Sequence, residues 1–170
     1  MMIRLIGAVL VITASTAMGF GVAAAHKKET LALQHLIRAL EFMSWELEYR
    51  MPPLSELCRL TALQVTGPVR MLFMNLEREL QMQIAADATC CMAVAIDKTD
   101  KLPAIVIQNL LLLGKTLGRF DLSGQLSGIA SVCQLCCRDL EGLQNNQQLR
   151  LRSYRTLGIC AGIALVILFI

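Results

Sequence analysis

The sequence is poor in the residues on which nucleic-acid binding and acid–base catalysis usually depend. Aromatic residues make up 5% of the chain, histidine occurs twice, and the formal net charge is only +3. The basic residues are not interleaved with aromatic ones, which argues against nucleic-acid binding. His26 and His35 have no serine, cysteine or aspartate at the spacing of a catalytic pair. We therefore expect no nucleic-acid partner, no enzymatic activity and no cofactor.

A phosphate-binding loop, internal repeats and strand-like alternation are also lacking. Gly114-Lys115-Thr116 comes nearest to a phosphate loop, but that motif needs a glycine five residues before Gly114, where Asn109 stands. Apolar residues instead recur at three- and four-residue steps, the period of amphipathic helices. The sequence therefore predicts an all-α protein, an antiparallel bundle of about six helices.

Charge is scarcest at the two ends of the chain, where apolar residues are concentrated. Residues Leu5 to Ala25 carry no charge over about twenty positions, the length that a helix needs to cross a hydrocarbon core of roughly 30 Å. The uncharged residues 156–170 would reach about 22 Å as a helix. The pattern predicts an N-terminal transmembrane helix at residues 1–25, a helical domain at residues 26–155 and a C-terminal transmembrane segment at residues 156–170.

Basic residues border both predicted membrane segments on the side of the central domain. Lys27 and Lys28 follow the first segment, and three arginines at residues 150–155 precede the second. The excess of positive charge on cytoplasmic loops places the central domain in the cytoplasm. A signal peptide cleaved after Ala25, releasing an exported helical domain, is the alternative. Small residues on which the two membrane helices could pack closely are Ala17, Gly21, Gly158 and Gly162.

The seven cysteines are an odd number and include adjacent pairs, a poor framework for disulfides. We expect them to be reduced. Cys133, Cys136 and Cys137 share one helical face, and with Cys90 and Cys91 they could supply thiolate ligands for zinc. Core packing is the simpler interpretation, because free cysteine is among the most buried residue types. A cysteine-rich metal- or redox-active protein is thus the alternative to a scaffold.

Prolines, glycines and capping residues divide the central domain into helices. Pro52-Pro53 ends the first, because proline removes a backbone donor. That first helix carries Glu41, Glu46 and Glu48, which we interpret as a solvated face, with a contact patch for a basic partner as the alternative. The predicted helices are residues 29–50, 54–65, 68–85, 88–96, one that begins at Pro103, and one that runs from Asp121 into the tail.

The stretch from Gly114 to Gln125 predicts a corner between two packed helices. Leu110 to Leu113 and Leu117 are expected on the buried face of the first helix. Gly118 stands where a left-handed C-cap is needed, and Asp121 where an N-cap side chain could accept from the next helix. The motif residues are Gly114, Leu117, Gly118, Asp121 and Gln125.

Four stretches stand out along the sequence: Arg4 to Leu10 with Ser15-Thr16 and Gly19-Phe20; Arg38 to Glu41 and Leu47 to Tyr49 with Pro52-Pro53-Leu54; Gly114 to Asp121 with Gln125 and Ile129; and Leu157-Gly158 with the aliphatic end. In this order and spacing they resemble the stage III sporulation protein AB family of endospore-forming Firmicutes, over nearly the full length. The chain departs from the family pattern before the proline turn, where a threonine is expected and Met51 and Pro52 stand instead.

The resemblance implies a cytoplasmic helical domain related to the F-family platform proteins of type II secretion. It implies a non-enzymatic protein that is required for endospore formation and can meet a secretion-type ATPase. The expected partners are the membrane, that ATPase and other subunits of the channel between mother cell and forespore. The expected location is the mother-cell side, in the outer forespore membrane.

Overall fold

The structure, a computed structural model, describes residues 27–82, 87–118 and 121–169, with side chains described as far as Asn145. Within these ranges the chain is helical and contains no strand, so the all-α prediction of about six helices is confirmed. The helices are residues 27–49, α2 (Leu54–Gln64), α3 (Gly67–Met82), α4 (Ala88–Asp97), α5 (Ala104–Thr116) and α6 (Leu122–Phe169).

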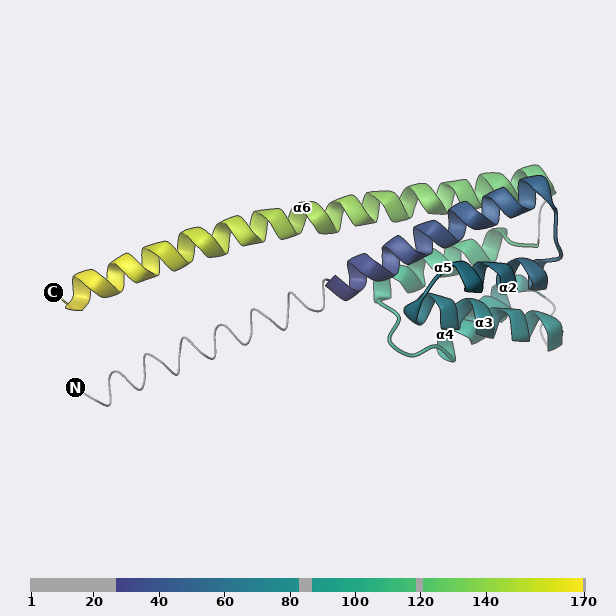
Figure 1. Ribbon diagram of the computed structural model, residues 1–170, viewed down its shortest axis with the longest axis horizontal. Helices are drawn as coiled ribbons and strands as arrows, with labels where there is room; N and C mark the ends of the chain where they lie inside the picture. The colour runs from purple at the N-terminus through teal and green to yellow at the C-terminus, as the bar shows by residue number, and fades with distance from the viewer. Residues whose placement is uncertain (1–26, 83–86, 119–120, 170) are drawn as a thin grey trace.

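The helices run up and down, and each helix from α2 to α5 contacts the next helix in the chain. The first helix and α6 lie side by side in opposite directions, and α6 extends far beyond the other helices (Figure 1). We call the end with the turn at residues 50–53 and the start of α6 the distal end. The opposite, proximal end holds the turns at residues 65–66 and 98–103, and α6 leaves the bundle there.

Local sequence explains where the helices begin and end. The first helix stops before Pro52-Pro53, and the N–H groups of Arg50 and Met51 both donate to the carbonyl of Glu46, at 2.9 and 3.1 Å. Met51 there adopts φ 47°, a left-handed conformation that is uncommon for a residue with a Cβ. At α4, the Asp87 side chain accepts from the N–H of Thr89, an N-cap bond.

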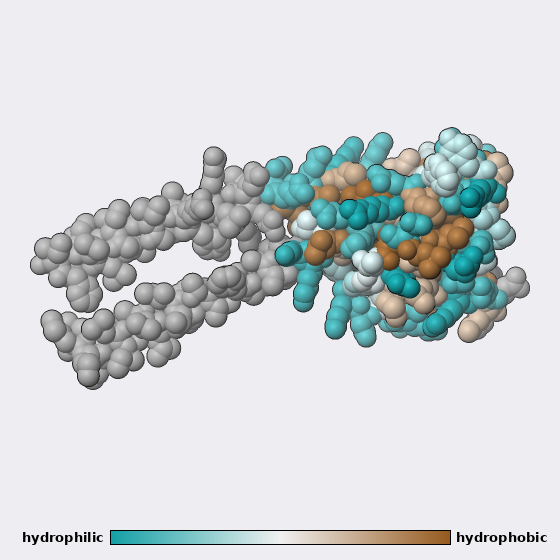
Figure 2. All heavy atoms as spheres, viewed as in Figure 1, coloured by the Kyte–Doolittle hydropathy of each residue, from teal (hydrophilic) through white to brown (hydrophobic). Residues whose placement is uncertain are grey.

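The core is one apolar cluster drawn from all six helices. Phe73 of α3 is among its largest fully buried side chains, and the first helix contributes Leu33, Leu36, Leu40 and Met43. His35 joins this helix to the turn before α3, since its Nε2 lies 3.2 Å from Thr66 Oγ1. On the face shown in Figure 2, hydrophilic side chains of the described residues surround a hydrophobic patch.

Two predictions about burial are wrong in part. Glu46 is only 3% exposed rather than solvated, because it follows Met43 by three residues and borders the buried face of the helix. In α5, Leu110 and Leu113 are buried, whereas Leu111 and Leu112 are exposed. Four consecutive residues cannot share one face of a helix that turns every 3.6 residues.

The predicted membrane segments fall mostly outside the described residues. Ala17 and Gly21 lie there, as does the proposed cleavage after Ala25. Gly158 and Gly162 lie within α6, beyond the last described side chain. No helix in the described ranges has the length and apolar character needed to span a membrane.

Candidate functional site

The predicted corner joins α5 to α6. Leu117 is buried at the end of α5 and donates its N–H to the Leu113 carbonyl at 3.1 Å. Gly118 follows with φ 73°, as a left-handed C-cap requires. Asp121 Oδ1 accepts the N–H of Gly124 at 3.1 Å, and its Oδ2 accepts the Ser123 hydroxyl at 2.7 Å. These bonds from Ser123 and Gly124 lower the Asp121 pKa and fix the start of α6.

Two glycines let helices approach closely on either side of this corner. A Cβ at Gly114 would lie 2.9 Å from the Cβ of Met92 in α4. A Cβ at Gly128 would lie 2.6 Å from the Cβ of Thr116, at the end of α5. The hydroxyl of Thr89 in α4 also donates to the Gly114 carbonyl, at 3.1 Å. The corner therefore serves to pack α4, α5 and α6 closely together. Gly128 could not be predicted from the sequence, because its closeness to Thr116 arises only in the fold.

The Gly114-Lys115-Thr116 stretch forms the last turn of α5. A phosphate loop instead precedes a helix and points backbone N–H groups at the anion. The C-terminal turn of a helix presents carbonyl groups, which repel phosphate. The geometry thus argues against a nucleotide site at these residues, as the spacing did.

A buried polar contact links α5 to α6. Asn109 is 4% exposed, and its amide nitrogen donates to Asp139 Oδ2 at 2.8 Å and to the Ile105 carbonyl at 3.0 Å. An asparagine within an apolar helix gives no sign of its partner thirty residues away, so this contact was not predicted.

The cysteines whose side chains the structure describes are not arranged as a thiolate cage. Cys136 is buried, Cys133 is half-buried and Cys137 is exposed, since consecutive residues of a helix point in different directions. Burial raises the pKa of Cys133 to about 11 and that of Cys136 to about 12, which keeps both thiols protonated. Within the described residues, no three His, Cys, Asp or Glu side chains are grouped so as to hold a metal ion.

An open groove of about 440 Å³ runs between the first helix and α6. Glu41 lies on the wall formed by the first helix, and Cys133 and Arg138 lie on the wall formed by α6. The negative charge of Glu41 contributes to the raised pKa of Cys133, in addition to burial. The remaining lining residues are Ser44, Ala130, Gln134 and Cys137.

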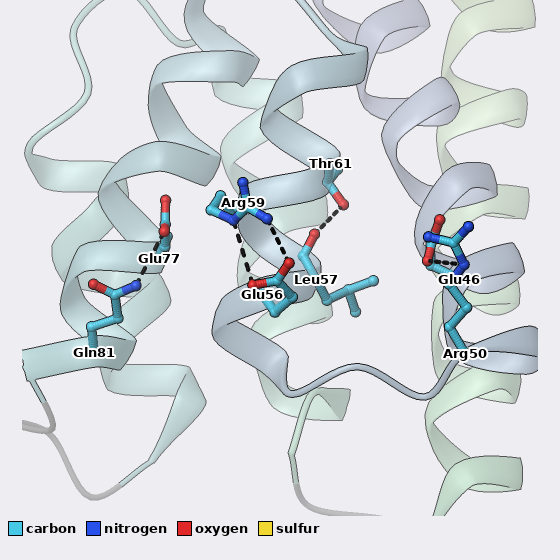
Figure 3. A network of polar contacts seen from close by, with 8 residues as sticks. All are labelled: Glu46, Arg50, Glu56, Leu57, Arg59, Thr61, Glu77 and Gln81. Carbon is cyan, nitrogen blue, oxygen red and sulfur yellow. Dashed lines mark hydrogen bonds and ion pairs between the residues drawn. The ribbon is translucent and has the colours of Figure 1, made fainter.

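The last turns of the first helix combine a buried carboxylate with exposed aromatic rings. Glu46 Oε2 has no hydrogen-bond partner, and the Arg50 Nε that approaches it is 3.8 Å away (Figure 3). Trp45 is 50% exposed and Tyr49 is 68% exposed, with ring centroids 5.4 Å apart. At this part of the distal end, exposed aromatic side chains therefore lie beside charged ones.

Comparison with known proteins identifies the family. Among curated proteins, no sequence matches this chain. A solved structure of stage III sporulation protein AB (SpoIIIAB) has a similar fold, with a TM-score of 0.64 at 22% identity; the match covers 72% of this chain and 98% of the other. The family model for stage III sporulation protein AB matches residues 4–170. The chain therefore belongs to the stage III sporulation protein AB family.

Proposed function

We propose that the protein is a non-enzymatic membrane platform of the channel complex between mother cell and forespore, required for endospore formation. Its family supports a role in sporulation. In this proposal, residues 1–25 and 156–170 form a hairpin in the outer forespore membrane, and residues 26–155 lie on its cytoplasmic, mother-cell side. The bundle docks a secretion-type ATPase, while the hairpin gathers other channel subunits.

The arrangement of the first helix and α6 is the observation that supports this proposal. The first helix begins at the proximal end, and α6 leaves the bundle at that same end (Figure 1). Both uncharged runs of the sequence therefore continue from one end of the bundle, each next to basic residues. A hairpin anchor needs this geometry, and the positive flanks then favour a cytoplasmic bundle.

The alternative, a metal- or redox-active protein, has no comparable support. Burial raises the pKa values of Cys58 and Cys136 to about 12, so neither thiol is a ready nucleophile. We therefore retain a single proposed function.

Co-purification from sporulating cells tests the platform. The full chain carries an affinity tag, is extracted in mild detergent and is probed for the secretion-type ATPase. The proposal predicts that the ATPase is retained, and that deletion of the gene abolishes spores until the tagged chain restores them. A tagged chain that restores spores but never retains the ATPase would contradict the docking half of the proposal.

A further inference from the structure

The outer face of the last turns of the first helix is both acidic and aromatic. Glu41, Trp45, Glu48 and Tyr49 are all exposed, and they stand at positions i, i+4, i+7 and i+8 of one helix. Residues three or four apart are neighbours on a helix surface. The four side chains therefore form one continuous surface, which we call the acidic–aromatic face.

The two carboxylates of this face lack partners within the bundle. Among the described residues, neither the Glu41 nor the Glu48 carboxylate forms an ion pair or a hydrogen bond. Three arginines border the face: Arg38, which is exposed three residues before Glu41; Arg50, which approaches the buried Glu46; and Arg138, across the groove from Glu41. The bundle thus leaves two carboxylates unneutralised beside two exposed rings.

The position of Glu48 is unfavourable for the isolated helix. It lies in the last turn, where the helix dipole has its negative end and favours cations. Glu46, in the same turn, adds a buried carboxylate oxygen without a hydrogen-bond partner. Local choices that oppose helix stability are expected where a surface serves another purpose.

We propose that the acidic–aromatic face docks a basic segment of a protein partner, through arginine or lysine side chains. A cation placed over Trp45 would be attracted by the ring, and Glu41 and Glu48 would flank it. Aromatic residues are enriched at protein interfaces, which suits Trp45 and Tyr49 in this role. The basic character of the partner follows from the face itself. Only the identification of that partner with the secretion-type ATPase rests on the proposed platform function.

The face is also in the right place for such a partner. It lies at the distal end, away from the end where α6 leaves the bundle (Figure 1). If the two tails enter a membrane, the bundle separates this face from the lipid, which disfavours a lipid surface as its occupant. A cytoplasmic protein that approaches the distal end would contact the acidic–aromatic face directly.

Trp45 makes the binding test direct, because it is the only tryptophan in the chain. The full chain in mild detergent is titrated with an acetylated tetra-arginine amide, and Trp45 fluorescence is followed at low and high salt. A tetra-glutamate peptide is the control probe. Saturable binding of the arginine peptide, weakened by salt, is expected.

Two matched double variants separate the face from general acidity. Glu41→Gln with Glu48→Gln should weaken binding about three- to tenfold, because each flanking ion pair at an exposed site contributes modestly. Asp100→Asn with Glu141→Gln removes the same charge from exposed positions elsewhere and should change affinity less than about twofold. Equal affinity in both double variants would overturn the inference, and circular dichroism checks that each variant is folded.

Crosslinking then tests the occupant in sporulating cells. A photoreactive residue at Tyr49 should capture a partner peptide that carries arginine or lysine within the crosslinked segment. Capture of lipid, or of a second copy of this chain, would overturn the inference. If wild type retains the ATPase and the Glu41→Gln, Glu48→Gln variant retains it equally, with the crosslink elsewhere, the inference fails and the platform proposal stands.

Discussion

Two glycines on α6 should respond to alanine with opposite signs. Replacing an exposed helical glycine by alanine stabilises a helix by about 0.8–1 kcal/mol. Gly142→Ala should show this gain, since nothing lies within 4 Å of the new Cβ. Gly128→Ala gains the same propensity, but its Cβ would lie 2.6 Å from the Cβ of Thr116 and 2.8 Å from its Cγ2.

The contact at Gly128 decides the sign there. Carbon atoms pack at about 3.5–4.0 Å, so the end of α5 must move by about 1 Å. Overpacking of this kind costs about 1–3 kcal/mol. The Gly128→Ala chain should therefore be less stable than wild type by about 1 kcal/mol, and less stable than the Gly142→Ala chain by about 2 kcal/mol.

Chemical unfolding of the full chain in mild detergent, followed by helical circular dichroism, measures both changes. Thr116→Gly removes the three atoms nearest to the new Cβ, so a double-mutant cycle should show favourable coupling between Thr116→Gly and Gly128→Ala. Gly128→Ala that stabilises as much as Gly142→Ala, with no coupling to Thr116, would refute the close packing of α5 on α6.

Three further predictions follow from the corner, the polar contact and the cysteines. Gly118→Ala should destabilise by about 1 kcal/mol because of its φ of 73°, and Gly118→Asn by less; thermal unfolding compares them. Asn109→Leu removes the bond to Asp139, a charged acceptor, and should cost about 1.5–3 kcal/mol in urea unfolding, with much less lost if Asp139→Leu is added. Because folding raises the pKa values of Cys133 to about 11 and Cys136 to about 12, their contribution to stability is complete below the unfolded pKa and is lost as pH rises toward these values. The free energy of unfolding should thus fall above about pH 9, and Cys136→Ala should flatten that fall in urea unfolding at each pH.

The sequence was enough to predict the helices and the corner, because local signals set them. Proline at 52–53 and 103 and aspartate at 87 and 121 stand at helix boundaries within a few residues of those observed. Gly118 has the left-handed φ that a C-cap requires. Periodicity also predicted most of the buried face of the first helix, since three- and four-residue steps are visible in the sequence.

Features that depend on two distant segments could not be predicted in this way. Asn109 and Asp139 meet only because α5 packs on α6, and Gly128 meets Thr116 for the same reason. Glu46 looked like one member of an exposed acidic group until packing placed it at the edge of the core. The acidic–aromatic face could therefore be defined only from the structure, which shows that Glu41 and Glu48 are exposed and that Glu46 is buried.

The central claim is a bundle on the cytoplasmic side of a membrane hairpin, and sidedness tests it most directly. A single cysteine replaces Asn145, an exposed residue of α6, in a full-length chain whose native cysteines are substituted and which still supports spores. A membrane-impermeant maleimide is then applied to cells whose wall has been made permeable, before and after lysis. The account predicts labelling only after lysis. Labelling in intact cells would contradict it and would favour an exported domain.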